Sequence, residues 1–568
     1  MASPWRRRLR RTVRVACAIP VLAVAAFFGL DALYPFPEEL LTRPATSPFL
    51  TASDSDLIRV QLTDREEWRR PVPLARISSN LIEATIAVED RRFRTHLGVD
   101  PIAIVRAGLQ NLAGGRRVSG ASTLTMQWVK MRSGNTRRTV WNKLQEAFRA
   151  LQVERILSKN EILERYLNLA PYVGNHRGVE AASLELFGKH AADLSRPEAY
   201  LLAGLPQSPA RHNPRRHRES AARRRATVLA ACVQTGNLPA VEAQAIASTW
   251  PTLQSAPRPL IAPHFARMAF EQRPAGGRST LDSELQRHAE EVVARRVRNL
   301  PEGADVALVA IELETGAVRA LVGSADVNDP MDGQVNGATA WRSPGSALKP
   351  FLYAAAFEAH LATPDTQIDD SPMEIAGWAP NNFDGEFVGM VSAREALRRS
   401  LNIPAMRMAH LAGLPRVIGV LESAGVRFLP GRAQEAGLAL ATGAAEVRLI
   451  DLTCAYATLG RKGRFLPWVL FEDELELQGN GTRVLSEPTC ENLLGILSSK
   501  ERVENARPDA HHFAWKTGTS SAFRDAWSLG YDGKMAVGIW VGNFSGAPDR
   551  AFTGSEAATP ILVEFLCE

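Results

Sequence analysis

Ser346-Ala347-Leu348-Lys349 follows Pro344-Gly345 and opens an apolar run over residues 351–361 that is compatible with a helix. A spacing of three on a helix places the serine hydroxyl and the lysine amine on the same face. A free serine hydroxyl is a weak nucleophile, and an adjacent lysine with a lowered pKa can act as its base. The tetrad therefore predicts a nucleophilic serine at the start of a helix.

Two further motifs give this tetrad its context. Ser400-Leu401-Asn402 follows a predicted helix over residues 392–399, and Lys516-Thr517-Gly518-Thr519 lies between an apolar stretch and a strand-like one. In this order the three motifs resemble the SxxK, SxN and KTG signature of penicillin-binding enzymes and serine β-lactamases. The resemblance implies an α/β fold of that kind for residues 301–568.

The resemblance also implies a role for each motif. Ser346 is the nucleophile with Lys349 as its base, and its backbone N–H forms an oxyanion hole with that of Thr519. Ser400 relays protons to the leaving group, and Asn402 holds a substrate amide. The implied catalytic residues are Ser346, Lys349, Ser400, Asn402 and Lys516, and the implied substrate-binding residues are Thr517, Gly518 and Thr519.

The pattern around these motifs agrees with a mixed α/β domain. Residues 306–313 and 317–322 are apolar runs separated by Glu314-Thr315-Gly316, which predicts a β-hairpin. Residues 534–541 predict another strand near the end of the chain. We therefore expect strands at both ends of this segment, with helices between them.

Residues 78–248 have a different, helical pattern. Apolar residues recur at helical spacing, as in Leu144, Phe148 and Leu151, which predicts one buried helix face. Leu81, Ala84 and Val88 give the same prediction for an earlier helix. Few alternating β-branched runs interrupt the region, so we expect a mostly α domain.

Five further motifs occur in order in this helical region. They are residues 89–100 (EDRRFRTHLGVD), 120–130 (GASTLTMQWVK), 143–146 (KLQE), 159–168 (KNEILERYLN) and 203–209 (AGLPQSP). They resemble the motifs of family 51 peptidoglycan glycosyltransferases, whose domain is mostly α and lysozyme-like. With the serine motifs downstream, the chain from about residue 75 resembles a class A bifunctional penicillin-binding protein. Residues 342–345 (RSPG) and 523–527 (FRDAW) resemble its 1C branch.

Joining sugars requires a base for the attacking hydroxyl and help for the leaving group, and two separated carboxylates are a familiar means. The resemblance implies Glu89 as the catalytic base on the acceptor 4-hydroxyl. It implies Glu146 as the catalytic group that assists the departing pyrophosphate, directly or through a divalent cation. From the residues alone, the simpler interpretation of both glutamates is ordinary acids of a helix surface. The implied substrate-binding residues are Asp90, Phe93, His96, Ser122, Thr123, Gln127, Lys130 and Lys143.

No cofactor is implied as required, and no metal ligand is assigned. A divalent cation, Mg²⁺ or Mn²⁺, at the glycosyltransferase pyrophosphate site is the one addition that the resemblance allows. Lys130 and Lys143 would then share with it the neutralisation of the pyrophosphate charge.

The N-terminus predicts a membrane anchor. Six arginines between positions 6 and 14 precede an uncharged stretch over residues 15–30, and no acidic residue occurs before Asp31. Such a charge bias keeps this end cytoplasmic and exports the rest. A cleaved signal peptide is the alternative, but bulky residues including Phe27 and Phe28 stand where a cleavage site needs small ones.

The predicted organisation follows from these patterns and from a Pro- and Gly-rich stretch over residues 251–277. It is a cytoplasmic basic tail over 1–14, a transmembrane anchor over 15–34, a juxtamembrane connector over 35–75, a glycosyltransferase domain over 76–248, a linker over 249–300 and a transpeptidase domain over 301–568. A chain of 568 residues is too long for one core, since cores stop growing near roughly 250–300 residues.

Composition excludes some functions. The net charge is +6, but no basic stripe interleaved with aromatics predicts nucleic-acid binding. The basic cluster from Arg211 to Arg225 could contact anionic lipids, although a solvated helix face is the simpler interpretation. The five cysteines form no CxxC pair. Cys454 and Cys490 could pair in an oxidising compartment, and buried thiols are the simpler interpretation.

The first functional hypothesis is a bifunctional enzyme of the bacterial inner (cytoplasmic) membrane, single-pass, with its catalytic domains periplasmic or extracellular. It would polymerise lipid II into β-1,4 glycan strands and cross-link stem peptides through a Ser346 acyl-enzyme. Its partners would be lipid II, nascent peptidoglycan and the membrane, with β-lactams as covalent inhibitors. The alternative keeps only the polymerase, with the serine domain as a β-lactam-binding or sensing module. A third reading, a soluble β-lactamase or carboxypeptidase fused to a structural helical domain, is disfavoured by the five upstream motifs.

Overall fold

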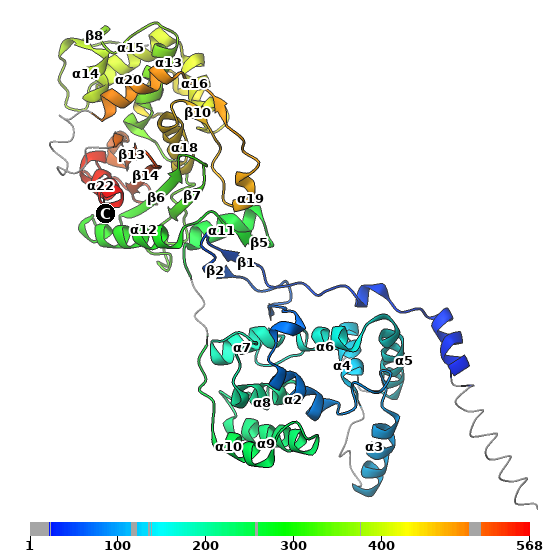
Figure 1. Cartoon of the computed structure of the whole chain (residues 1–568). Helices are drawn as coiled ribbons and strands as arrows, with labels where there is room; N and C mark the ends of the chain where they lie inside the picture. The colour runs from blue at the N-terminus through cyan, green and yellow to red at the C-terminus, as the bar shows by residue number, and fades with distance from the viewer. Residues whose placement is uncertain are drawn as a thin grey trace, which may run out of the picture. The chain divides into compact units, whose positions relative to one another are not determined.

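The computed structural model describes residues 22, 24–114, 122–134, 137, 139–255, 260–374, 377–498 and 513–567. The chain divides into two compact units, Met1–Pro48 with Gln61–Arg258, and Phe49–Val60 with Pro259–Glu568. Figure 1 shows that helices build the first unit and that the second contains a central sheet. The prediction of a helical unit followed by an α/β unit is therefore confirmed.

The first unit is a set of helices whose starts are fixed by local side chains. Its helices are α2 (Ser79–Glu89), α3 (Pro101–Gly114), α4 (Leu124–Ser133), α5 (Val140–Ile156), α6 (Lys159–Leu167), α7 (Val179–Phe187), α8 (Arg196–Gly204), α9 (Arg218–Gln234) and α10 (Ala240–Ser248). Thr123 accepts from the backbone N–H of Met126 and so caps α4. Ser158 and Glu161 form a capping box at the start of α6.

Short elements complete this unit. They are η1 (Glu38–Leu40), η2 (Leu74–Arg76), η3 (Leu205–Gln207) and the parallel pair β3 (Trp68–Arg69) and β4 (His176–Arg177). The apolar stripe predicted for α2 is confirmed, because Leu81 and Ala84 are buried and Val88 packs against the same core.

The predicted buried face of α5 is wrong. Leu144 is 58% exposed, and the buried residues of the helix are Ala150, Gln152 and Val153. Periodicity identifies an apolar face but not what covers it, and no described residue covers the start of this one. Further along, Phe148 meets Phe27, with their ring centroids 5.7 Å apart.

The second unit is organised by an antiparallel sheet with strand order β12-β13-β14-β6-β7. Its strands are β6 (Asp305–Glu312), β7 (Val318–Val322), β12 (Ala514–Thr519), β13 (Asp525–Tyr531) and β14 (Met535–Gly542). The predicted hairpin is confirmed by the β6–β7 pairing. The expected strand near the C-terminus is confirmed too, because β14 pairs with β6 and joins the two ends of the segment.

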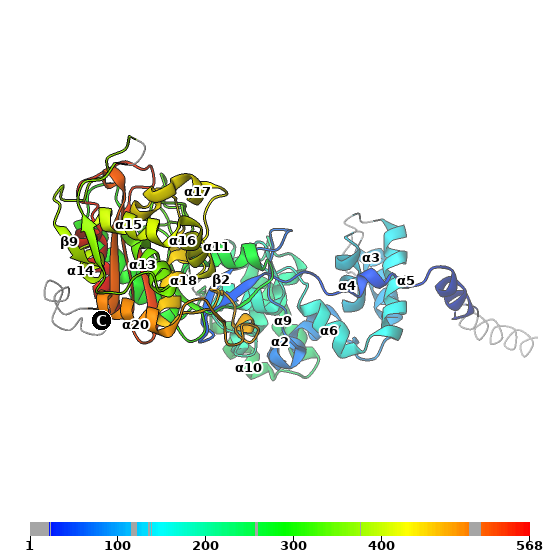
Figure 2. The ribbon, with the colours of Figure 1, turned by 90° about the horizontal axis from the view of Figure 1, so that it is seen from above.

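Helices cover both faces of this sheet. Val306 and Leu308 of β6 pack with α12 (Ser283–Arg296) and α22 (Thr559–Cys567), whereas Val309 packs into a separate cluster with α13 (Lys349–Glu358) and α18 (Leu449–Gly460). Successive strand residues point to opposite faces, so a strand covered on both sides is apolar throughout. Figure 2 shows α13 and α18 beside the sheet from above.

The remaining elements of this unit surround that sandwich. They are β1 (Phe49–Thr51), β2 (Leu57–Val60), β5 (Gly276–Arg278), α11 (Pro263–Gln272), η4 (Val297–Asn299), η5 (Gly345–Leu348), β8 (Gln367–Asp370), β9 (Gly389–Ser392), α14 (Ala393–Arg398), α15 (Asn402–Ala412), α16 (Leu414–Ser423), α17 (Arg432–Ala436), η6 (Gly437–Thr442), β10 (Arg464–Phe465), α19 (Glu472–Leu475), β11 (Thr482–Arg483), α20 (Glu487–Leu497), η7 (Ser521–Phe523) and η8 (Gly554–Ala558).

Two predicted connecting segments are structured. Residues 249–300, predicted as a linker, contain α11 and α12, and Phe265 of α11 is fully buried in the core of the second unit. Residues 35–75, predicted as a connector, contain β1 and β2, and β1 pairs in parallel with β5. The prolines and glycines mark the breaks between these short elements rather than an unstructured stretch.

The structure describes only part of the predicted N-terminal tail and membrane anchor. The tail over 1–14 and residues 15–21 and 23 of the predicted anchor lie outside the described residues, and residues 24–33 are helical. Within the described part of the chain, no helix combines the length and the apolar character needed to cross a membrane.

Three glycines allow the segments around the serine tetrad to touch. A Cβ on Gly345 would lie 2.3 Å from the carbonyl oxygen of Thr519, and one on Gly518 would lie 2.2 Å from that of Pro344. Gly443 has φ +83°, and a Cβ there would lie 2.2 Å from the backbone nitrogen of Gly345. These contacts hold η5 against the end of β12 and against η6.

We expect Gly443→Ala to lower the free energy of unfolding of the second unit by about 1–3 kcal/mol, because it adds a clash and a left-handed strain together. Gly419 of α16 has open space around it, so Gly419→Ala is the matched control and should stabilise by about 0.5–1 kcal/mol. Calorimetric unfolding of both variants measures the difference. Equal stabilities would show that the η5–η6 contact is not tight.

Candidate active sites

The serine tetrad lies at the junction of η5 and α13. Gly345 adopts φ +54° and so turns the chain into η5, and Tyr456 of α18 donates to the carbonyl of Ala347 at 2.7 Å. Lys349 is the first residue of α13 and is fully buried, whereas Ser346 is partly exposed. The serine is therefore accessible and the amine beside it is shielded from water.

The amine of Lys349 is held by the second motif. Its Nζ donates to the carbonyl oxygen of Ser400 at 2.6 Å and to Oδ1 of Asn402 at 2.7 Å. Burial lowers the pKa of Lys349 from 10.5 to about 7. Among the described residues no carboxylate pairs with this amine and no hydrogen bond joins it to the Ser346 hydroxyl. An amine of this kind is largely neutral just above pH 7 and can accept a proton.

Ser400 links the two lysines of the site. Its Oγ lies 2.8 Å from Nζ of Lys516 and 3.5 Å from Nζ of Lys349. Ser400 has φ +61°, an unusual conformation for a residue with a side chain. Strain of this kind persists only where the surroundings fix it, and here it places the hydroxyl between two amines.

The loop before β9 supports Asn402. Asn382 accepts from the backbone N–H of Asn402 at 2.7 Å, and the Asn402 side chain donates to the carbonyl of Asn381 at 2.8 Å. Asn382 in turn donates to the buried Asp370. The sequence pattern did not single out Asn382, because its only signal is a pair of asparagines in a loop.

The third motif forms the edge strand β12. Lys516 is 1% exposed, and its Nζ also donates to the carbonyl of Thr517 at 2.8 Å. Thr519 accepts from the backbone N–H of Gly554 at 3.1 Å. The structure therefore brings together all three predicted serine-site motifs around Ser346.

In the first unit, the end of α2 presents Glu89. One oxygen of Glu89 lies 2.7 Å from Nη2 of Arg224, and the other accepts from Nε2 of Gln127 at 3.1 Å. Gln127 also accepts a 3.4 Å contact from the hydroxyl of Tyr166. Burial and then the charge of Glu89 raise the pKa of Tyr166, so that phenol stays protonated. Glu89 thus has a fixed orientation on α2.

A second group of predicted residues meets at the start of α5. Nζ of Lys143 lies 2.9 Å from a carboxylate oxygen of Glu146 and 2.5 Å from the Ser122 hydroxyl. Lys143 is 42% exposed, whereas the Glu146 side chain is 12% exposed. Lys130 of α4 is partly exposed and has no side-chain partner among the described residues. This group offers a cationic surface backed by one carboxylate.

Four residues predicted to bind substrate have buried side chains. Asp90 and His96 are buried, and both Asp90 oxygens lie within 3.0 Å of Nε2 of His96. Phe93 is fully buried, and Thr123 caps α4 and donates to the carbonyl of Gly98. Their side chains are buried in contacts within the protein, and their role in substrate binding stays a prediction. They hold the loop after Glu89 against the start of α4.

The basic cluster of α9 is not simply a solvated face. Arg225 is 4% exposed and donates to the carbonyls of Ala247 and Thr249, and the Arg224 side chain is 10% exposed in its pair with Glu89. The other arginines of the cluster are exposed, so the solvated interpretation holds for them: Arg211, Arg215, Arg216, Arg218 and Arg223. A signal was present, because Ala221 and Val228 share the helix face of Arg225.

Three of the four described cysteines are buried thiols, and the fourth, Cys567, is exposed. Cys232, Cys454 and Cys490 are free and buried, so the simpler interpretation is confirmed for them. Burial raises the pKa of Cys454 to about 11 and that of Cys490 to about 12. Neither thiol is poised as a nucleophile.

Comparisons with known proteins agree with both sites. The transglycosylase family model matches residues 55–233, and the model of the penicillin binding protein transpeptidase domain matches residues 306–560. Penicillin-binding protein 1C of Escherichia coli (strain K12) is 35% identical, over 96% of this chain and 70% of that protein. Penicillin-binding protein 1B of Vibrio cholerae is 31% identical, over 86% and 67%.

A solved structure shares the fold. The crystal structure of penicillin-binding protein 1A from Haemophilus influenzae aligns with a TM-score of 0.60 at 18% identity, over 92% of each chain. At that identity the likeness concerns the arrangement of the elements alone.

We expect Asp90→Asn to lower the free energy of unfolding of the first unit by about 1–3 kcal/mol, because it weakens buried hydrogen bonds to His96 and to the Leu124 backbone. The exposed Asp64 supplies the control Asp64→Asn, which removes one charge and should have little effect. Calorimetry of the full chain checks both. An unchanged first-unit transition in Asp90→Asn would contradict a holding role for this pair.

Proposed function

This chain belongs to the class A penicillin-binding proteins, bifunctional enzymes of peptidoglycan synthesis, and from that premise we propose which of its residues carry each reaction. The observation that carries the proposal is the buried amine of Lys349 beside Ser346, linked through Ser400 to Lys516. It supplies a nucleophile, a base that is neutral near pH 7 and a route for the proton.

In the transpeptidase reaction, Ser346 Oγ attacks the carbonyl of the donor stem peptide and its proton passes to Lys349. The oxyanion is held by the backbone N–H groups of Ser346 and Thr519. When the terminal D-Ala leaves, its nitrogen receives that proton through Ser400, and the acyl-enzyme remains. An acceptor amine then attacks the ester, loses its proton by the same route and regenerates the serine.

Recognition of the donor uses the remaining residues. Lys516 and Thr517 bind the terminal carboxylate, because a buried ammonium and a hydroxyl at a strand edge are complementary to it. Asn402 holds a peptide amide, and Gly518 keeps β12 close to the tetrad. β-Lactams acylate Ser346 by the same route and are inhibitors.

In the glycosyltransferase reaction, Glu89 accepts the proton of the acceptor 4-hydroxyl as that oxygen attacks the donor sugar of lipid II. Gln127 and Arg224 orient the carboxylate for this. Lys143 and Lys130 bind the departing pyrophosphate, and Glu146 positions Lys143. Inversion at the attacked carbon gives a β-1,4 link.

A resident divalent cation does not fit this site well. No group of three His, Cys, Asp or Glu side chains gathers for a metal within the part of the chain that the structure describes. Glu146 is already paired with the ammonium of Lys143. The reaction is therefore assigned to the side chains, and an ion bound to pyrophosphate would belong to the substrate.

We propose that residues 15–34 anchor the chain in the cytoplasmic membrane with the catalytic units outside. Exposed apolar side chains on the first unit support this, namely Ile102, Ile104 and Val105 of α3 and Val140, Trp141 and Leu144 of α5. Figure 1 draws α3 below α5, and Figure 2 draws both helices at the same end of the first unit. Apolar surface of this kind is typical of membrane contact.

Acylation of Ser346 by a fluorescent penicillin should depend on pH through Lys349. Its pKa is lowered from 10.5 to about 7, so the amine is neutral above that pH and protonated below it. The labelling rate should therefore fall about tenfold for each pH unit below about 7. Lys349→Arg, which stays charged, should label negligibly at every pH. A rate independent of pH between about 5 and 8 would exclude Lys349 as the base.

Polymerisation of labelled lipid II should collapse in Glu89→Gln by about 10²–10⁴-fold, because the amide keeps the shape but cannot accept a proton. Glu83 lies exposed on the same helix, so Glu83→Gln is the matched control and should polymerise normally. Penicillin labelling of Ser346 should persist in both. Near wild-type polymerisation by Glu89→Gln would overturn the assignment of the base.

A further inference from the structure

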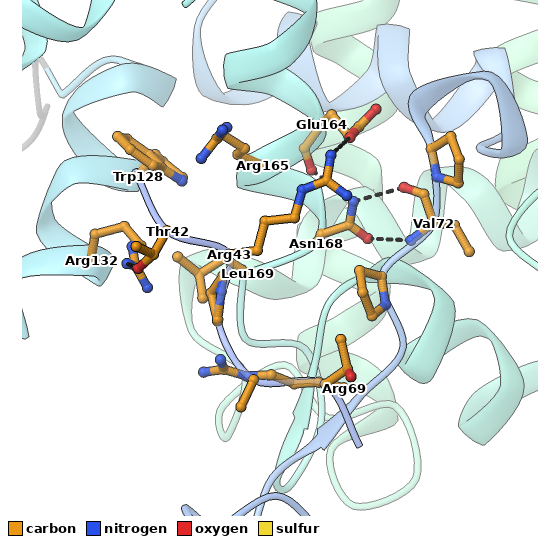
Figure 3. Close-up of a pocket in the computed structure, with 15 residues that line it drawn as sticks. Thr42, Arg43, Arg69, Val72, Trp128, Arg132, Glu164, Arg165, Asn168 and Leu169 are labelled. Atoms are coloured by element: carbon orange, nitrogen blue, oxygen red, sulfur yellow. Dashed lines mark hydrogen bonds and ion pairs between the residues drawn. The ribbon is translucent and has the colours of Figure 1, made fainter. Parts of the chain in front are cut away.

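A cavity of about 390 Å³ lies in the first unit between the connector and helices α4 and α6. Its walls include residues 42–46 and 71–73 of the connector, and Trp128 at its edge is 1% exposed. Four of its lining residues are arginines, each from a different segment: Arg43, Arg69, Arg132 and Arg165. Figure 3 shows these four side chains around the hollow, which we call the arginine pocket.

Two of these arginines already have carboxylate partners. Arg69 lies 2.5 Å from Glu67, which also binds Arg177 at 2.9 Å. Arg43 lies 4.0 Å from Glu164 and is 82% exposed. The positive charges of these two side chains are therefore each paired with a carboxylate, Arg69 inside the pocket and Arg43 at its rim.

The other two arginines have neutral partners. Arg132 donates to the carbonyls of Leu40 and Glu39 at 2.8 and 2.7 Å. Arg165 donates to the carbonyl of Leu41 at 2.6 Å. Neither Arg132 nor Arg165 has a carboxylate partner in the part of the chain that the structure describes. Two guanidinium groups thus share one cavity without a directly paired carboxylate, and an acidic group that influences Arg165 through its charge is Glu161 on the same helix.

This concentration of charge is unfavourable unless an anion is present. Burial, and then the charges of Arg69 and Arg165, lower the pKa of Arg132. Nε of Arg69 is buried and has no hydrogen-bond partner among the described residues. An unpartnered buried donor and like charges at close range each cost free energy that a bound anion would remove.

We propose that the arginine pocket binds a phosphate or pyrophosphate group, either free in solution or at the head of a membrane lipid. Two guanidinium groups without a directly paired carboxylate match a dianion, whereas one carboxylate would neutralise only half of their charge. Several guanidinium forks converging on one cavity suit the many oxygens of such a group. The apolar surfaces of Trp128 and Val72 are compatible with a carbon chain attached to it.

The arginine pocket is distinct from the glycosyltransferase cleft, although helix α4 belongs to both. Gln127, which contacts Glu89, and Lys130 share one face of α4. Trp128 and Arg132 lie on another face, since each residue advances about 100° around a helix of 3.6 residues per turn. Binding in the pocket therefore does not require an active catalytic site, and its test is independent of the proposed catalytic roles.

The test is calorimetric titration of the full-length protein in detergent micelles. Lys143→Gln serves as the parent, because it weakens the phosphate contacts proposed for the cleft. The probes are inorganic pyrophosphate, a short-chain phosphatidic acid, and a phosphatidylcholine of the same chain length. We expect the parent to bind pyrophosphate or phosphatidic acid, and Arg165→Gln added to it to weaken that binding roughly 10- to 100-fold.

Two further variants separate binding from folding. Arg165→Lys keeps the positive charge but loses the paired N–H donors of the guanidinium group. This variant should bind the probe more weakly than the parent and more tightly than Arg165→Gln. Arg223 is 73% exposed and lies outside the pocket, so Arg223→Gln should bind like the parent. If phosphatidic acid binds about tenfold more tightly than pyrophosphate, the ligand is a lipid head group. If phosphatidic acid binds equally or more weakly, the ligand is a free phosphate group. A parent that binds neither, or Arg165→Gln binding as tightly as the parent, would overturn the proposal.

Discussion

The fully buried amine of Lys349 joins two of the three segments on which the serine site depends. It donates to the carbonyl of Ser400 and to the side chain of Asn402. Movement of the start of α15 would therefore leave the buried amine of Lys349 without hydrogen-bond partners. The glycine contacts between η5, η6 and β12 complete the same arrangement. Because no carboxylate of the described chain compensates this amine, its environment favours the neutral form. The same burial therefore fixes the geometry and sets the chemistry.

The polar side chains of the first unit are held differently, because they pair with one another. Glu89 of α2 meets Arg224 of α9, and Asp90 meets His96 beneath the start of α4. Lys159 joins Glu154 and lies over the ring of Phe93. The Glu89–Arg224 pair ties the proposed base to an element far away in sequence, so the position of that base depends on the packing of α9. In the arginine pocket this pairing is incomplete.

Sequence reasoning predicted the parts of this architecture that short patterns encode. The continuous apolar runs before Glu314 and after Gly316 predicted the hairpin, and three ordered motifs identified residues that the fold brings together. It could not predict which apolar face is covered, as Leu144 shows, because periodicity carries no information on the neighbouring element. Proline and glycine marked the breaks around α11 and α12 but suggested a linker. Within the motifs, spacing did not separate residues that face the cleft, such as Gln127, from those that support it, such as Phe93. Arg224 was missed because a run of arginines is usually solvated.

The central claim is that one chain both polymerises and cross-links, rather than polymerising with a serine domain that only binds β-lactams. The most direct measurement gives the purified full-length protein labelled lipid II and resolves glycan polymer from cross-linked product, with and without penicillin. Without penicillin we expect polymer and cross-links, and with penicillin we expect polymer alone, because the drug occupies Ser346 and leaves Glu89 free. The result that would contradict bifunctionality is polymer without any cross-links in the absence of penicillin. The same preparation must label fully at Ser346 when penicillin is added, which shows that the serine site is intact.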